Sequence, residues 1–124
     1  MKTIKNIMPQ EIEVWYLLPA LRRELTNIFI KEYGLSQKDV ADILGVTEAS
    51  ISHYLSYKRA AEINFSKKDK EKIRGYAERI LKDKKNFMKY FYELSSFLKK
   101  PEIICRIHKS KDKSISKSCK VCFK

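Results

Sequence analysis

The sequence predicts an all-α fold: a bundle of about five helices that ends in a long helix or helix pair and a small tail. The 124 residues include only 3 glycines and 3 prolines, too few for the many turns of a sandwich or barrel. Hydrophobic residues make up 44% of the chain, which is enough for a packed core. Apolar residues also recur at three- and four-residue intervals over long stretches, as on the buried face of a helix.

The first long helix is expected over Pro19–Tyr33. Proline is tolerated at the first position of a helix, because its missing N–H has no partner there. Gly34 follows the last apolar residue and is a typical helix stop. The preceding segment, Glu11–Leu18, is either a short helix or an extended arm. Within it, Trp15 and Tyr16 are expected to pack on the core.

Two short helices separated by a three-residue turn come next. Ser36 is the expected N-cap of the first, which runs to Leu44. In the turn Gly45–Thr47, glycine supplies a left-handed backbone conformation and threonine caps the next helix. That helix, from Glu48 to about Ser56, buries apolar residues on one side and presents small polar ones on the other. This arrangement is a helix-turn-helix, whose second helix enters the major groove of duplex DNA.

The outer face of the second helix supplies the candidates for base recognition. The side chains expected to reach base edges are Glu48, Ala49, Ser52 and His53. Of these, Glu48 either accepts a hydrogen bond from a cytosine amino group or faces solvent. The residues expected to contact phosphates are Gln37, Lys38, Thr47, Ser50, Lys58 and Arg59. For Gln37 and Thr47, helix capping alone is the alternative role.

This segment resembles the Cro and phage-repressor class of helix-turn-helix regulators. The matching residues are Leu35-Ser36-Gln37, Val40-Ala41, Leu44-Gly45-Val46-Thr47, Ile51-Ser52 and Leu55. A narrower set is similar to small archaeal transcriptional regulators with a Cys-rich tail: Met8-Pro9, Glu11-Ile12, Trp15, Leu18-Pro19 and Lys58-Arg59. The sequence departs from the class at Tyr57, where glycine is common. The resemblance implies a sequence-specific regulator of transcription that binds double-stranded DNA as a homodimer.

The second half of the chain is basic and amphipathic. Residues 1–65 carry eight basic and eight acidic side chains, whereas 66–124 carry 19 basic and seven acidic ones, so the net charge of +12 lies in the second half. Such a segment favours a polyanion as partner, with solubility alone as the alternative.

After a helix start at Ser66, the residues that recur seven apart are Ile73, Ile80, Phe87 and Leu94. They form either a dimer seam on one long helix or an intramolecular core, with two helices broken near 84–86. Pro101 is expected to end the helix.

The C-terminal tail contains a possible metal site. Cys105 and His108 are separated by two residues, as are Cys119 and Cys122, with ten residues between the pairs. Four such ligands suit a structural zinc ion. An iron–sulfur cluster is the less favoured alternative because clusters more often use cysteines only. In the third alternative no metal binds, and Cys119 and Cys122 are unliganded or form a redox pair.

The predicted organisation is therefore a DNA-binding domain over 1–65, a basic helical segment over 66–100 that is a candidate for dimerisation, and a Cys/His tail over 101–124. No apolar run is long enough for a membrane span and no secretory signal is visible, so a cytoplasmic protein is expected. No phosphate-binding glycine loop, nucleophile elbow or HExxH motif occurs, which argues against an enzyme. The alternative function is a protein-interaction or general nucleic-acid-binding module that uses the basic helix and a zinc-knuckle tail.

Overall fold

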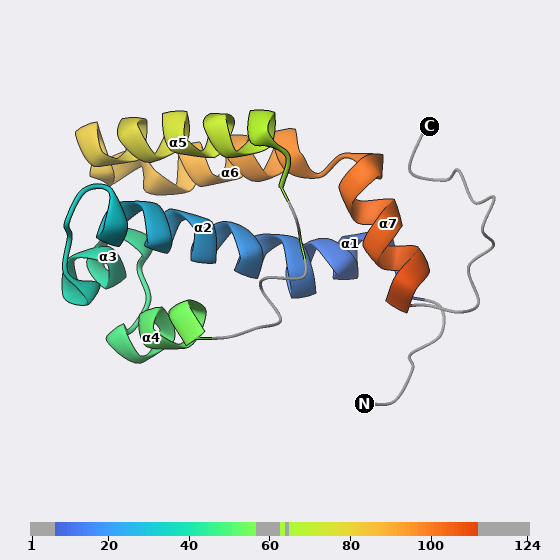
Figure 1. Cartoon of the computed structure of the whole chain (residues 1–124), viewed down its shortest axis with the longest axis horizontal. Coiled ribbons are helices and arrows are strands. Elements are labelled where there is room, and N and C mark those ends of the chain that lie inside the picture. The colour runs from blue at the N-terminus through green and yellow to red at the C-terminus, as the bar shows by residue number, and fades with distance from the viewer. Residues whose placement is uncertain (1–6, 57–62, 64, 112–124) are drawn as a thin grey trace.

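The computed structural model of the protein describes residues 7–56, 63 and 65–111, and every element in these ranges is helical (Figure 1). The all-α prediction is therefore confirmed. The elements are α1 (Pro9–Ile12), the π-helical turn η1 (Glu13–Leu17), α2 (Leu18–Lys31), α3 (Gln37–Leu44), α4 (Glu48–Ser56), α5 (Lys67–Lys82), the 3₁₀ turn η3 (Lys84–Asn86), α6 (Phe87–Leu98) and α7 (Pro101–Lys111).

The segment before Pro19 is helical and runs without a break into α2. The Leu18 N–H bonds the carbonyl of Glu13, five residues back, which is the bond of a π-helix. Proline has no N–H to donate and its ring crowds the carbonyl four residues back, so a widened turn before Pro19 relieves this crowding. The expected packing is right for Tyr16, which is buried. It is wrong for Trp15, which is 42% exposed.

Helix α2 is the centre of the molecule. Figure 1 shows α2 between α3 and α4 on one side and α5 and α6 on the other. Its side chains Leu21, Leu25 and Phe29 are fully buried and belong to one hydrophobic cluster that includes residues of the other long helices. Because α2 separates the two pairs of helices, it holds α4 and α5 on opposite sides of the molecule.

The heptad stripe of the second half belongs to this core. Ile73, Ile80 and Leu94 are fully buried within the chain, and Phe87 is partly buried and packs against them as part of the same cluster. The helix breaks at η3, in the stretch 84–86 where the sequence allowed a break, and α5 and α6 pack against each other. Of the two alternatives for the stripe, the structure shows the intramolecular core, so these side chains are not available to a second copy.

The segment after Pro101 is more ordered than the sequence suggested. Helix α6 ends at Leu98, as expected from the proline, but Pro101 then begins α7. Helix α7 packs against α1 and buries Ile103, Ile104 and Ile107. Residues 101–111, which the sequence predicts as the start of the Cys/His tail, are therefore a helix of the folded body, because these isoleucines share one helix face. Within the described ranges, no helix combines the length and apolar character of a membrane span.

Candidate nucleic-acid interface

The turn between α3 and α4 is held by local hydrogen bonds, as the sequence predicts. Ser36 Oγ accepts from the Asp39 N–H (3.1 Å), and the Asp39 carboxylate accepts from the Ser36 N–H (3.4 Å). Gly45 has φ +71°, the left-handed conformation expected of it. Thr47 Oγ1 accepts from the Ser50 N–H at 3.1 Å and caps α4. These bonds fix the position of α4 relative to α3.

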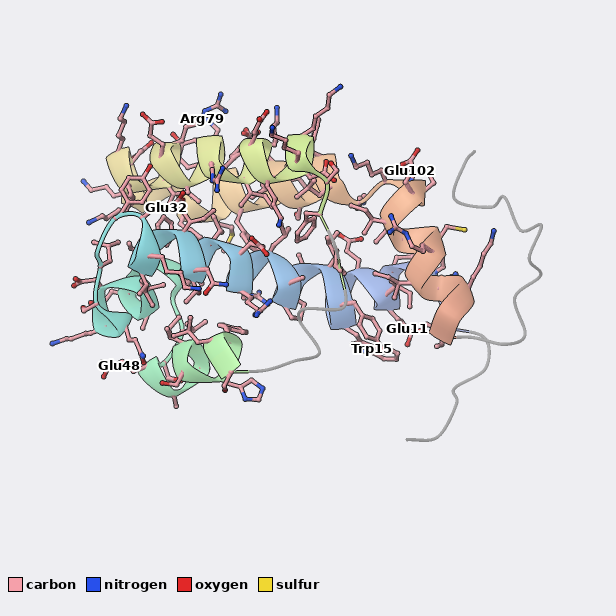
Figure 2. All side chains as sticks on the ribbon, in the orientation of Figure 1. Glu11, Trp15, Glu32, Glu48, Arg79 and Glu102 are labelled. Atoms are coloured by element: carbon pink, nitrogen blue, oxygen red, sulfur yellow. The ribbon has the colours of Figure 1, made fainter. Side chains whose placement is uncertain are left out.

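Helix α4 packs on α2 through the fully buried Ile51 and presents its other side to solvent. The four side chains predicted to reach base edges are all exposed on this outer side: Glu48, Ala49, Ser52 and His53. Figure 2 shows Glu48 pointing away from the body of the molecule. The outer face of α4 is thus accessible in the described part of the chain, as binding in a major groove requires.

A hydrogen bond that the sequence analysis missed joins the two helices of the motif. Ser52 Oγ on α4 donates to Gln37 Oε1 at the first residue of α3 (2.8 Å). The Ser52 hydroxyl proton is therefore donated to Gln37, which leaves the Ser52 oxygen as a hydrogen-bond acceptor. The Gln37 amide nitrogen keeps its donor capacity for a phosphate. Residues 15 apart in sequence give no local signal for such a bond.

The motif itself is acidic. Among residues 37–56 the only basic side chain besides histidine is Lys38, against Asp39, Asp42 and Glu48. Two of the predicted phosphate contacts, Lys58 and Arg59, lie outside the described residues. The others flank the start of α3 and of α4: Gln37, Lys38, Thr47 and Ser50. The described part of the motif therefore offers an anion few charges, besides the N–H groups at the starts of α3 and α4.

The positive charge of α5 lies on the other side of the molecule. In Figure 2, Arg79 points outward from α5 on the side opposite Glu48. The charge of this helix is part of the basic second half for which the sequence predicts a polyanion as partner. Because α2 lies between α4 and α5, a duplex held against α4 does not contact the outer face of α5.

The structure places half of the predicted metal ligands. Cys105 and His108 lie one turn apart on α7, so they share a face, and both are buried. His108 Nε2 donates a hydrogen bond to the carbonyl of Ile7, which joins α7 to the start of the first helix. Cys119 and Cys122 lie outside the described residues. Within the part that is described, no three His, Cys, Asp or Glu side chains come together as a metal site, so the tail site stays a prediction.

Comparison with known proteins identifies the same segment as the geometry does. Residues 29–68 match the family described as Helix-turn-helix. This span includes the end of α2 and all of α3 and α4. Comparisons with curated proteins and with solved structures gave no match. The narrower resemblance to archaeal regulators stays a prediction.

Proposed function

We propose that the protein is a transcriptional regulator of the Cro and repressor type that binds specific sequences of double-stranded DNA as a homodimer. The match of residues 29–68 to the family described as Helix-turn-helix supports this. The observation that carries the proposal is the exposed outer face of α4, made of small polar side chains on a helix fixed by a capped turn. DNA binding fits the cytoplasmic location expected from the sequence.

In this proposal α4 lies in the major groove. Ala49, His53 and Tyr54 line a shallow hollow on the surface of α4, where the Ala49 methyl is placed to contact a thymine methyl. His53, one turn further along, donates to a purine N7. Glu48 accepts from a cytosine amino group or faces solvent, and Ser52 accepts a hydrogen bond while bonded to Gln37.

Phosphate contacts set the position of the motif on the duplex. Gln37 and Lys38 begin α3, and Thr47 and Ser50 lie at the start of α4, so both helix N-termini direct N–H groups and side-chain donors at phosphates. Lys58 and Arg59 follow α4 in the sequence and would add the two charges that the motif lacks. Phosphate contacts of this kind position a protein without selecting a sequence.

A homodimer is proposed because one helix reads too few base pairs for strong selection, and two half-sites one helical turn apart remedy this. The heptad stripe, which was the candidate dimer seam, lies in the core, so a dimer needs another face of the molecule. Val14 and Trp15 are 57% and 42% exposed, and Figure 2 shows Trp15 on the same side of the molecule as Glu48. A two-fold axis at these apolar side chains directs both α4 helices toward one duplex.

Sedimentation equilibrium of the full chain tests the dimer. We expect the wild type to dimerise, and we expect Val14→Ser with Trp15→Ser to be monomeric at the same concentration with unchanged helix content. The control is Met88→Ser with Tyr92→Ser, because both side chains are highly exposed on α6. A monomeric wild type, also when bound to DNA, would contradict the dimer.

Selection from a random duplex pool tests sequence-specific binding. The full chain should enrich one motif with two half-sites, and footprinting should show protection one helical turn apart. Ser52→Ala with His53→Ala should lose the enrichment, whereas Ser96→Ala, an exposed change on α6, should leave it intact. Equal binding of all duplexes, or stronger binding of single strands, would favour the general nucleic-acid-binding module.

We further propose that the tail binds a structural zinc ion through Cys105, His108, Cys119 and Cys122. Two features support this: α7 puts Cys105 and His108 one turn apart, and His108 donates a hydrogen bond from Nε2 to the Ile7 carbonyl. Metal-binding histidines usually donate their other ring N–H to such a partner. Zinc supplies order to the tail rather than chemistry, because four protein ligands leave no open position.

Native mass spectrometry of protein purified without added metal tests the zinc site. One zinc per chain is expected, and Cys119→Ser with Cys122→Ser should lose the metal. Ser114→Ala with Ser116→Ala, in the same tail, is the control and should keep it. Iron in place of zinc would indicate a cluster, and protein without any metal would contradict the site.

A further inference from the structure

Helix α5 carries more basic side chains than any other helix in the described part of the chain, and nothing in the proposed operator complex uses its outer face. Helix α5 carries seven basic and three acidic side chains. One of the acids, Asp69, is buried and bound to Lys100 Nζ (2.7 Å), which leaves Glu71 and Glu78 as the acids at the surface of this helix. The outer face therefore has a strong excess of positive charge.

Three of the basic side chains form a row. Lys68, Lys72 and Arg79 recur at intervals of four and seven residues, which puts them on one side of α5. This side of α5 borders α6, and two of the three cations, Lys72 and Arg79, lie over aromatic rings of α6 and of α5 itself. Lys72 Nζ lies 4.5 Å from the centre of the Phe97 ring and 5.8 Å from that of Tyr76, and Arg79 Cζ lies 5.0 Å from Tyr76. We call Lys68, Lys72 and Arg79 the basic row.

The rings restrict two of the three cations of the basic row, Lys72 and Arg79. A cation over an aromatic face is already partly ordered, so less side-chain entropy is lost when it meets an anion. Two carboxylates near the row already have partners. Glu93 accepts a hydrogen bond from the Tyr76 hydroxyl (3.3 Å), and Asp69 is bound to Lys100.

The first turn of α5 adds charge where folding stability does not favour it. Lys67, Lys68 and Lys70 lie in the first turn after the Ser66 cap. The positive end of the helix dipole disfavours cations there and favours acids. These lysines therefore oppose helix stability, and an anion bound beside them would offset this cost.

The basic row lies across the molecule from α4. Arg79 and Glu48 project on opposite sides in Figure 2, and α2 lies between the two helices in Figure 1. A duplex in contact with α4 therefore leaves the α5 face exposed. That face can bind a different polyanion at the same time.

We propose that the α5 face binds the phosphate backbone of a second duplex DNA segment, so that one molecule bridges two duplexes. The bridging rests on the proposed function, because the first duplex is the one that α4 binds. Helix α5 has 16 residues and is about 24 Å long, so the row can follow several phosphates. Single strands fit less well, because they need open aromatic rings for base stacking, and Lys72 and Lys100 already lie over the Phe97 ring.

A two-duplex capture assay with the full chain tests this. The selected duplex is fixed to beads, protein is added, and a fluorescent 40-base-pair duplex of unrelated sequence is supplied in solution. The wild type should capture the fluorescent duplex, and capture should fall steeply with salt. The glutamine variant combines Lys68→Gln, Lys72→Gln and Arg79→Gln. It should bind the beads as well as the wild type does, but it should capture at least tenfold less of the fluorescent duplex.

Two further variants separate charge from folding. Lys68→Arg with Lys72→Arg and Arg79→Lys keeps every charge and should keep capture. Lys67→Gln with Lys70→Gln should raise the melting temperature, since it removes cations from the first turn, while lowering the slope of log K against log salt for the second duplex by about 2.

Three outcomes would overturn the proposal. Full capture by the Lys68, Lys72, Arg79 glutamine variant would mean that dimers bridge through two α4 helices. An equal loss of bead binding and capture would mean general electrostatic attraction, and capture of single strands in preference to duplex would mean a different partner.

Should selection yield no preferred sequence, the proposed function fails. Titration of the unselected duplex with wild type and the glutamine variant then tests the α5 face alone, and equal affinities would refute it.

Discussion

At the scale of single residues, the proposed function depends on side chains that do little for folding. The outer residues of α4 are exposed, so removing them changes DNA contacts far more than core packing. A few buried polar groups act in the opposite way, because they affect stability and never meet DNA. The two groups can be separated by experiment.

His53→Ala should change sequence preference more than overall affinity. Loss of one base contact costs about 1–3 kcal/mol at the base pair that it reads and little elsewhere. Competition titrations with single-base variants of the selected duplex measure this. Lys58→Ala is the contrasting change and should weaken binding to all sequences alike. If His53→Ala weakened every duplex by the same factor, His53 would be a phosphate contact.

Thr26→Val should raise the free energy of unfolding by about 1 kcal/mol. Thr26 is fully buried, and among the described residues its hydroxyl has no hydrogen-bond partner. Valine has nearly the same shape and removes the unpaired polar group. Thr26→Ser keeps the hydroxyl and loses a methyl group, so it should lower stability. Urea denaturation compares the three proteins, and a less stable valine variant would mean that the hydroxyl has a partner.

At the scale of elements, the sequence predicts what local bonds determine. Ser36, Gly45 and Thr47 act within four residues of themselves, and so α3, the turn and α4 were predicted correctly. The sequence does not predict the π turn before Pro19 or the exposure of Trp15, because both depend on how the continuous helix from α1 to α2 packs. The start of α7 at Pro101 was missed for a similar reason, because its apolar face becomes evident only against α1.

Gly45→Ala should lower the free energy of unfolding by about 1–2 kcal/mol. Its φ of +71° is costly for a residue with a side chain, whereas a Cβ there would meet nothing within 4 Å. The cost is therefore conformational. Gly75→Ala is the matched control, because Gly75 is helical and equally unobstructed. It should raise stability by about 0.5–1 kcal/mol. Equal effects of the two changes in thermal melts would show that the turn tolerates other conformations.

At the scale of the whole molecule, one core joins the DNA-binding motif to the basic helices. The sequence showed that the second half is basic but could not show which way α5 faces, because that depends on packing around α2. The buried ion pair of Asp69 and Lys100 contributes to this packing, since it ties the start of α5 to the junction of α6 and α7.

This ion pair predicts a dependence of stability on pH. Burial raises the pKa of Asp69, but hydrogen bonds from Lys100 and Ser66 and the charge of Lys100 outweigh it, so the pKa is below its usual value. A carboxylate with a lowered folded pKa stabilises the fold when it is ionised, at pH above its unfolded pKa of about 4. This contribution to the free energy of unfolding is lost as pH falls through the folded pKa. Asp69→Asn should therefore be less stable than wild type at pH 7, and the difference should narrow below pH of about 4. A constant difference in urea denaturation across this range would contradict the ion pair.

The central claim is that the outer face of α4 contacts bases in the major groove. Intermolecular nuclear Overhauser effects between the full chain and its selected duplex test it most directly. Contacts are predicted from the Ala49 methyl and the His53 ring to thymine methyl or cytosine H5 protons, which lie in that groove. Contacts to the duplex that come only from α5 or α7, with none from α4, would contradict the account.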